Sequence, residues 1–433
     1  MVEPVSSEIK ASRKGWFIVF VASLFFFYEF IQMNMFNAIS TDLMRAFSIG
    51  ATQLGELSSF YFFSNVIFLF VAGPLLDRYS TRWIMVVTLG ICILGISLFS
   101  MTYSFKIAIL ARFLEGIGSA FCFLSVIRLA SRWFPASSMA MMTGLIVTMA
   151  MLGGAVAQLP FAFLVKYFDW RQVIWLDAMF GLLIIIAIIL IVRDYPSEHS
   201  QEHEKEIKSL EQIGYWKSLR LAFLEIKNWL AGVYTCLMNL PLSLLGGLWG
   251  ILYLTDVHGF SKIEASNITT VLFAGTIIGS PIAGWISDKL KLRKLPMLFG
   301  ALISLAIILW IIYSHAHSFW VLWVSFFLVG LLTSTQIVSY AYVAESSPRL
   351  ITAMSVSAVN ITTQAGQGIF QPLFGYLIDL HSHEVHYGMV IYTPGDFHWA
   401  MMLFPIGFIL ALMAAFALKE TYGKQQEELP KSL

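Results

Sequence analysis

The chain carries two copies of one short pattern, GPLLDRYSTR at residues 73–82 and GWISDKLKLRK at residues 284–294. Each copy places a glycine four residues before an aspartate, which is followed at once by a basic residue and then by further basic residues. The two copies start 211 residues apart, about half of the 433-residue chain. A small residue lets two helices approach closely, and an acid at a helix end can pair with a base or cap a neighbouring helix. The repeat therefore predicts a chain built from two similar halves.

Around these loops the sequence is strongly apolar. Hydrophobic residues make up 58% of the chain and charged residues only 12%, whereas soluble domains carry about 25% charged residues. So little charge suits a surface that faces lipid, and about 20 apolar residues are enough for one helix to cross a bilayer. We therefore expect an all-α protein whose twelve membrane helices lie near 15–40, 50–76, 82–103, 106–133, 138–165, 170–192, 229–254, 262–287, 295–314, 319–344, 352–379 and 397–418.

The helices fall into two groups of six, separated by a polar stretch that contains HSQEHEKEIKSLEQ. This gives a short N-terminal segment (1–14), a first six-helix bundle (15–192), a linker (193–227), a second bundle (228–418) and a tail (419–433). The polar N-terminus has no small-residue cleavage site, so we expect the first helix to be retained.

Basic residues predict which way the helices cross. With both termini in the cytoplasm, twenty of the 27 Lys and Arg residues fall in cytoplasmic loops, as the positive-inside rule requires. Two more, Arg112 and Arg128, lie inside a predicted helix. The opposite side holds Arg45, Lys106, Lys166, Arg171 and Lys262. We expect a multi-pass protein of a bacterial inner membrane with both termini in the cytoplasm.

Several functions are disfavoured by composition. The net charge of +1 argues against nucleic-acid binding, which needs basic patches. Cys92, Cys122 and Cys236 all lie in apolar runs, so no disulfide framework is predicted. The chain has no G-x-x-x-x-G-K loop, which argues against ATP-driven pumping, and no catalytic pattern or cofactor motif appears.

The two repeated loops resemble the signature loop of the major facilitator superfamily. RFLEGIGSA, residues 112–120, is similar to a second motif of that superfamily, an arginine followed by a glycine-rich helix face. The resemblance covers residues 15–418 and implies two bundles that rock about a central site, so that access alternates between the two sides of the membrane. The residues that it implies for gating are Gly73, Asp77, Arg78, Arg82, Gly284, Asp288, Lys289 and Arg293.

Charged residues inside predicted helices mark a second feature. At about 1.5 Å per residue, Glu29 lies about 8 Å, and Arg112 about 9 Å, below the same membrane face. An intramembrane charge costs roughly 2.5–3.5 kcal/mol even on the gentlest scale, so such a residue indicates function. Glu29 is therefore one candidate partner for Arg112, and Glu115, one turn deeper than Arg112 and on nearly the same helix face, is a second.

A carboxylate that alternates between a neutral and a paired state can couple proton movement to transport. The resemblance implies the same, because several proton symporters of the superfamily have an acid in helix 1 and the motif arginine in helix 4. The alternative is a static ion pair that holds the two helices together. Arg128 fits snorkelling or an interface better than solute binding. Asp177 ranks below Glu29, because helix 6 is usually peripheral in the superfamily.

The second half has a polar helix face instead of buried charge. Asn360, Gln364, Gln367 and Gln371 follow the spacing of one helix face, which cannot face lipid. Asn239 precedes Pro241, which predicts a kink. Amides and aromatic rings suit a neutral or zwitterionic solute, although hydrogen bonding between helices would explain them too. The residues expected to contact solute are Gln32, Asn239, Trp249, Gln336, Tyr340, Asn360, Gln364 and Gln367.

The loop after helix 11 contains His381, His383, His386 and His398 beside acidic residues. Its spacing matches no metal motif, and we interpret it as a solvated loop.

Taken with the resemblance, the sequence predicts a monomeric transporter that imports a small organic nutrient (an amino acid, sugar or carboxylate) together with protons. The alternative is a proton-driven exporter of drugs or of a siderophore-like metabolite.

Overall fold

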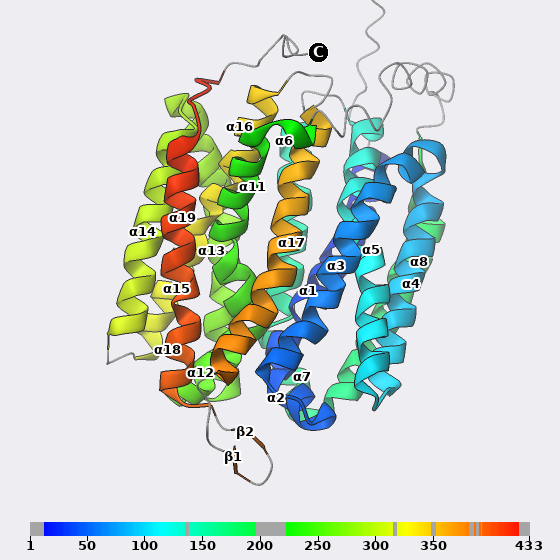
Figure 1. Cartoon of the computed structure of the whole chain (residues 1–433). Helices are drawn as coiled ribbons and strands as arrows, with labels where there is room; N and C mark the ends of the chain where they lie inside the picture. Colours follow the sequence, from blue (N-terminus) through cyan, green and yellow to red (C-terminus); the bar gives the residue numbers. More distant parts are fainter. Residues whose placement is uncertain are drawn as a thin grey trace, which may run out of the picture.

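The chain folds into a bundle of long, roughly parallel helices with one small β-hairpin at one end (Figure 1). We call this the hairpin end, and the opposite end, where the chain leaves its last helix, the terminal end. The computed structural model describes residues 13–134, 138–195, 222–314, 318–347, 352–380, 385–386, 389–390 and 392–423. Most of the predicted linker lies outside these residues.

The first half contains six membrane-length segments, two of them broken into two helices. Their bounds are α1 (Arg13–Asn34) with α2 (Phe36–Phe47), α3 (Ala51–Arg78), α4 (Thr81–Met101), α5 (Phe105–Trp133), α6 (Met139–Val156) with α7 (Leu159–Tyr167), and α8 (Trp170–Ile191).

The second half repeats this plan with more breaks. Its elements are α11 (Ile226–Met238), the π-helix η2 (Pro241–Trp249) and α12 (Gly250–His258), then α13 (Lys262–Leu290), α14 (Lys294–Tyr313), α15 (Phe319–Thr333) with the 3₁₀ turn η3 (Ser334–Gln336) and α16 (Ile337–Ser346), α17 (Thr352–Asp379), and α18 (Pro394–Met401) with α19 (Leu403–Ala417). Strands β1 (Val385–His386) and β2 (Met389–Val390) pair antiparallel between α17 and α18.

The helices have the length and polarity of a multi-pass membrane protein. Ten described spans are long and apolar enough to cross a bilayer, and the bent pair of Ile226–Met238 with Pro241–His258 makes an eleventh. Helix α17 has 28 residues but carries the row of amides and is not among those spans. With α17 counted by its length, the predicted total of twelve is approximately met, and the all-α fold is confirmed.

The outer surface of the bundle is apolar. On α8, for instance, Leu183 and Leu190 expose 63% and 67% of their surface. A row of such residues on a helix that is only one-third buried suits contact with lipid chains, because these residues would otherwise order water.

The predicted kink near Pro241 is confirmed. The chain bends by 44° between α11 and the segment that begins at Pro241. Proline has no backbone N–H to donate to the preceding turn, so the regular hydrogen-bond ladder is interrupted there. The nine residues Pro241–Trp249 form a π-helix, a conformation that is frequently found at functional sites.

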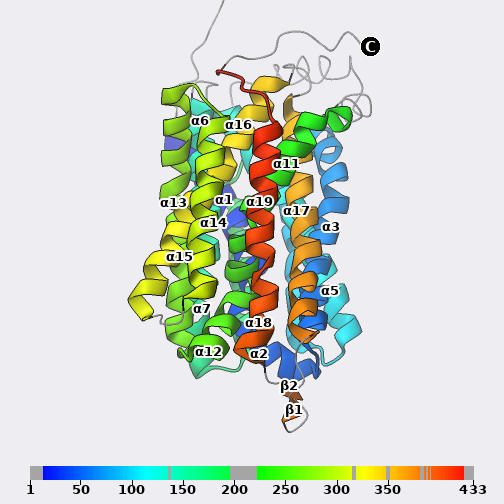
Figure 2. The same cartoon turned by 60° about the vertical axis from the view of Figure 1, so that its left-hand side comes forward.

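The two halves pack closely where α3 runs beside α17 (Figures 1 and 2). A side-chain carbon on Gly55 would lie 2.5 Å from the Cα of Pro372, and one on Gly375 would lie 2.4 Å from the carbonyl oxygen of Ala51. Only glycine fits at such distances, so these two positions set the close approach of the helices near the hairpin end.

Candidate functional site

A buried ion pair lies at the centre of the first half. Arg112 Nη1 donates to Glu115 Oε2 one turn along α5, and both side chains are fully buried. The same nitrogen donates to the carbonyl oxygen of Gln32 at 3.1 Å. The guanidinium lies 4.2 Å from the ring centre of Phe36 and 4.8 Å from that of Tyr61, which are cation–π distances. Arg112 is thus enclosed by groups from α1, α2, α3 and α5.

Glu29 lies beside this pair but is not part of it. Glu29 is 1% exposed, and its Oε2 accepts a hydrogen bond from the hydroxyl of Tyr61 at 3.1 Å. Gly118 leaves room for the other oxygen, because a side-chain carbon there would lie 2.6 Å from Glu29 Oε1. Among the described residues Glu29 forms no ion pair with Arg112, so this candidate pairing is not made in this conformation. Arg112 pairs with Glu115 because the two share one helix face at a three-residue spacing.

A third buried acid lies on α8. Asp177 Oδ2 accepts a hydrogen bond from Gln32 Nε2 at 2.6 Å, and its backbone carbonyl accepts one from the hydroxyl of Tyr28 at 3.1 Å. Gln32, predicted to contact solute, therefore joins α1 to α8 through its amide nitrogen. Among the described residues of the first half, three buried acids, Glu29, Glu115 and Asp177, lie around one fully buried base, Arg112.

Amide side chains join the two halves below this centre, toward the hairpin end. Asn37 Nδ2 donates to Gln158 Oε1 at 2.7 Å and to the carbonyl of Leu245 at 2.9 Å. Gln158 Nε2 donates to the carbonyl of Gly246 at 2.8 Å, and the backbone N–H of Ile251 donates to Asn37 Oδ1 at 3.0 Å. The carbonyls of Leu245 and Gly246 belong to the π-helix. Neither Asn37 nor Gln158 was predicted from the sequence as a functional residue.

Asp379, the last residue of α17, caps the first turn of α3 across the boundary between the halves. Its carboxylate accepts hydrogen bonds from the backbone N–H groups of Ala51 (3.2 Å) and Thr52 (2.7 Å), and from the Thr52 hydroxyl (2.6 Å). The hydroxyl of Tyr392 donates to Asp379 Oδ1 at 3.0 Å. Burial raises the pKa of Tyr392, so its hydroxyl keeps its proton. An acid at a helix N-terminus is stabilising, so this contact holds the hairpin end closed.

The polar face of α17 changes from half-buried to fully buried along the helix. Asn360 and Gln364 are half-buried, whereas Gln367 is 5% exposed and Gln371 is fully buried. Gln371 Nε2 donates to the carbonyl of Ser243 at 3.1 Å. The buried part of the face is therefore hydrogen-bonded to the π-helix through Gln371. The half-buried part, with Asn360 and Gln364, lies closer to the terminal end.

The remaining solute candidates line the same region of the second half. Trp249 is fully buried, donates to the carbonyl of Gln371 at 3.3 Å and stacks on Phe374. Asn239 lies at the bend after α11 and is half-buried. Gln336 and Tyr340 are half-buried where the 3₁₀ turn passes into α16.

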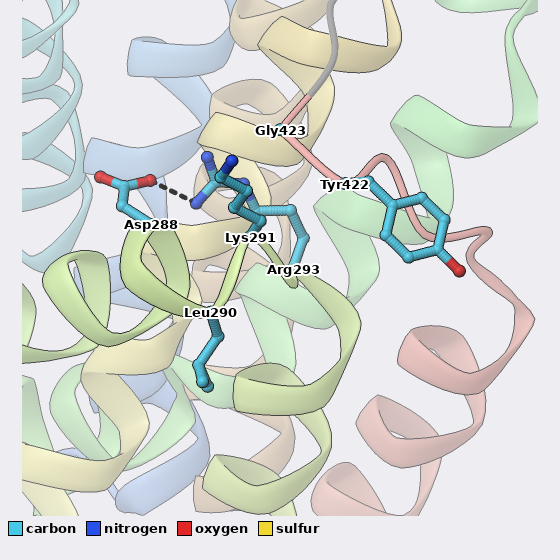
Figure 3. A pocket seen from close by; sticks show the side chains of 6 residues that line it. All are labelled: Asp288, Leu290, Lys291, Arg293, Tyr422 and Gly423. Atoms are coloured by element: carbon cyan, nitrogen blue, oxygen red, sulfur yellow. Dashed lines mark hydrogen bonds and ion pairs between the residues drawn. The ribbon is translucent and has the colours of Figure 1, made fainter.

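The second signature loop is held by Arg293 at the terminal end. This guanidinium donates to Asp288 Oδ1 at 2.6 Å and to both oxygens of Glu345, at 3.2 and 3.1 Å from Nε. The hydrogen bonds that Arg293 donates to the Glu345 carboxylate raise the pKa of Arg293. Asp288, Lys291 and Arg293 line an open recess of about 630 Å³ together with Leu290, Tyr422 and Gly423, in which the Asp288 carboxylate faces the guanidinium (Figure 3).

The internal repeat extends to the caps of the next helices. The backbone N–H of Arg82, at the start of α4, donates to Asp194 at 2.9 Å. At the start of α14 the N–H groups of Arg293 and Lys294 donate to Glu420 at 2.6 and 2.9 Å. Each acid lies three residues after the end of the last helix of its half, α8 or α19. The two halves therefore use the same cap.

The remaining signature-loop residues differ in their burial and packing. The close approach expected at Gly284 is wrong, because nothing lies within 4 Å of the position that its side chain would take. Helix α13 instead buries Ala283 and Ser287 there. Gly73 is half-buried, Arg78 and Lys289 are exposed, and the side chain of Asp77 lies outside the described residues.

The histidine-rich loop offers no metal site within the described part of the chain, where no three His, Cys, Asp or Glu side chains gather suitably. His381 and His383 lie outside that part. His398 packs edge-on against Tyr313, and Asp396 caps α18 through Thr393. The predicted solvated loop stays a prediction.

The fold and the buried charges define a multi-pass membrane protein of two repeated halves. The chain matches the Major Facilitator Superfamily over residues 20–243 and again over residues 231–433, and it belongs to that family. Members of this family are transporters and not enzymes, so this chain is a transporter.

Similar proteins cover most of the chain. The uncharacterized transporter YybO of Bacillus subtilis is 24% identical, over 87% of this chain and 91% of its own. A probable hexose phosphate transport protein of Chlamydia pneumoniae is 24% identical, over 72% and 74%. The crystal structure of a bacterial homologue of the human lysosomal transporter Spinster, inward-facing and unoccupied, has a TM-score of 0.71 at 16% identity and covers 94% of this chain and 98% of its own.

Proposed function

We propose that this chain imports a small organic solute together with protons across a bacterial inner membrane. The observation that supports this most is the position of Glu29, buried to 99% and bonded to Tyr61 but left without a base, beside the Arg112–Glu115 pair. An uncompensated carboxylate in a dry interior is most stable when it binds a proton. Glu29 is therefore suited to take up a proton in one conformation and to release it in another.

The coupling would depend on the orientation of Arg112. In the present conformation Glu115 compensates this base, so Glu29 is favoured as the neutral acid. A rearrangement of α1 against α5 that brings Arg112 to Glu29 would favour the Glu29 anion and expel the proton. Tyr61 contacts both side chains and would follow such a change.

The arrangement of the halves supports alternating access. Asp379, Asn37 and Gln158 form hydrogen bonds between the halves at the hairpin end, which is thereby closed. We assign the terminal end to the cytoplasm, because that orientation places most basic residues on the cytoplasmic side. In this assignment the conformation is closed to the periplasm, and transport requires that the contacts at the hairpin end break.

Relatives guide the choice of the first solutes to test. Proteins similar to this chain are named as a probable hexose phosphate transport protein and as a hexuronate transporter. For this chain we propose a small organic nutrient of comparable size.

The test is uptake into proteoliposomes that contain the purified protein. Radiolabelled hexoses, hexuronates, hexose phosphates and amino acids are offered with the lumen alkaline, and then with no pH gradient. Accumulation that depends on the gradient, and that a protonophore abolishes, is the expected result. Accumulation without a gradient, or efflux in exchange for external protons, contradicts proton-coupled import; the second result would indicate an exporter.

A further inference from the structure

A set of amide oxygens without hydrogen-bond partners lies where the two halves meet. Asn34 Oδ1, Gln367 Oε1 and Gln371 Oε1 are buried and accept no hydrogen bond within the described structure. The three side chains come from α1 and α17, one on each side of the boundary. A buried acceptor without a partner costs about 1–3 kcal/mol, so three together call for donors from outside the chain.

The orientation of two of these amides is fixed by their nitrogen atoms. Asn34 Nδ2 donates to the carbonyl of Phe30 at 2.7 Å, and Gln371 Nε2 donates to the carbonyl of Ser243 at 3.1 Å. Reversing either amide would place oxygen against oxygen. The free end of each side chain is therefore an acceptor.

Two of the amides meet at Gly247 in the π-helix. A side-chain carbon on Gly247 would lie 3.3 Å from Gln371 Nε2 and 3.6 Å from Asn34 Oδ1. Gln367 lies one turn before Gln371 on the same face of α17. Trp249, stacked on Phe374, borders the set on the π-helix side. These residues form what we call the amide site: Asn34, Gln367 and Gln371 beside Gly247.

The amide site lies at the buried end of the polar face of α17. Just beyond it, Gly55 of α3 meets Pro372 of α17, which closes the boundary toward the hairpin end. In the other direction Gln364 and Asn360 on the same face are half-buried. A solute that enters from the terminal end would meet these amides in sequence.

The elements of the second half that border the amide site carry no positive charge. The elements η2, α16 and α17 contain no Lys, Arg or His. Arg112, in the first half, is paired with Glu115 and covered by two rings, although its Nε and Nη2 donate no hydrogen bond within the described structure. Arg128 already has an interaction partner. An organic anion would bring acceptor oxygens to amides whose free ends are themselves acceptors, and η2, α16 and α17 offer no base to pair with its charge.

We infer that the amide site takes an uncharged or cationic solute that presents O–H or N–H donors, and that this chain does not take organic anions. The inference rests on the transport function proposed above and narrows it. It removes carboxylates from the predicted solutes, and it separates this chain from the relatives named for hexose phosphates and hexuronates.

The test compares solutes that share a carbon skeleton. Dissociation constants are measured on the full chain in nanodiscs for glucose, glucosamine, glucuronate and glucose 6-phosphate, for glycerol and glycerol 3-phosphate, and for putrescine and succinate. We expect a hydroxyl- or ammonium-bearing member to bind at least tenfold more tightly than its carboxylate or phosphate counterpart. The hydroxyl and ammonium members of each set then show which donor the site prefers. Preferred binding of an anionic member, or binding of no member, overturns the inference.

Variants connect that preference to the amide site. Gln367→Leu should weaken binding of the preferred solute about fivefold to tenfold, because one acceptor is lost. Gln367→Glu should strengthen binding of the ammonium members relative to the uncharged ones. The matched control is Ile369→Ala on the exposed face of α17, which should change neither. Equal effects of Gln367→Leu and Ile369→Ala contradict the assignment.

Binding and transport distinguish this inference from the function on which it rests. If a donor-bearing solute binds in the nanodisc assay but does not enter proteoliposomes, the amide site stands and the proposed transport fails. If an anion enters proteoliposomes in a proton-dependent manner, the proposed transport stands and the inference fails.

Discussion

The hydroxyl of Tyr61 donates to Glu29 at 3.1 Å, while its ring lies 4.8 Å from the guanidinium of Arg112. One side chain thus contacts both the unpaired acid and the paired base. Because the contacts are made by different parts of Tyr61, they can be separated by substitution.

Tyr61→Phe should keep the ring beside Arg112 and remove the hydrogen bond to Glu29. That bond favours the charged carboxylate, so without it Glu29 holds its proton more tightly. We expect the midpoint of the pH dependence of uptake to move to higher pH, by about 0.7 unit for a bond worth about 1 kcal/mol. An unchanged pH profile of initial uptake rates would show that Tyr61 has no part in proton binding.

Glu115→Gln should destabilise the fold, because it leaves Arg112 as a buried base without a counter-charge. Breaking a buried pair on one side costs about 3–5 kcal/mol, whereas replacing both partners often costs little. We therefore expect a clear fall in the thermal unfolding midpoint in detergent for Glu115→Gln, and partial recovery in Arg112→Met/Glu115→Gln. If the double variant is less stable than Glu115→Gln alone, the unpaired charge of Arg112 is not what destabilises the single variant.

Asp379→Asn should loosen the hairpin end. The neutral amide keeps the shape but loses the charge that stabilises the first turn of α3 and receives the Tyr392 hydroxyl. Spin labels on the hairpin-end tips of α3 and α17 should show a larger population of long distances. Asp256→Asn, an exposed acid on α12, is the matched control and should leave the distances unchanged. The cap would have no gating role if both variants gave the parent distribution.

The assignment of the terminal end to the cytoplasm predicts the side on which added domains appear. A fluorescent protein fused after residue 433 should fluoresce, and alkaline phosphatase at the same position should be inactive. The same pair inserted into the 193–227 linker should behave alike. An active phosphatase at either position would reverse the orientation.

Much of the fold followed from the sequence, because its signals are local or periodic. Apolar runs marked the spans, the two signature loops marked the repeat, and Pro241 marked the bend. Arg112 and Glu115 were found because charges stand out in apolar runs. Gly284 was misinterpreted, since close approach depends on a neighbouring helix that its sequence does not show.

The contacts between helices were harder to predict. Asn37 and Gln158 lie in different segments, and only packing brings them together with the carbonyls of the π-helix. Asp379 was predicted only as the last residue of the helix 352–379, because nothing local indicates that it caps α3 in the other half. Glu29 and Glu115 were both candidate partners of Arg112, and the pair with Glu115 is the one observed in this conformation. The sequence left the choice open, since depth along a helix does not state which way a side chain turns.

The central claim is that Glu29 carries the coupled proton, and Glu29→Gln tests it most directly. This variant mimics the permanently neutral acid, so it should still exchange solute in counterflow, which needs no net proton movement. It should lose accumulation driven by a pH gradient. Glu56→Gln, the same change at an exposed acid on α3, should retain both activities. Measured side by side in proteoliposomes, intact counterflow without gradient-driven accumulation in Glu29→Gln is the predicted result, and accumulation equal to the parent would contradict the claim.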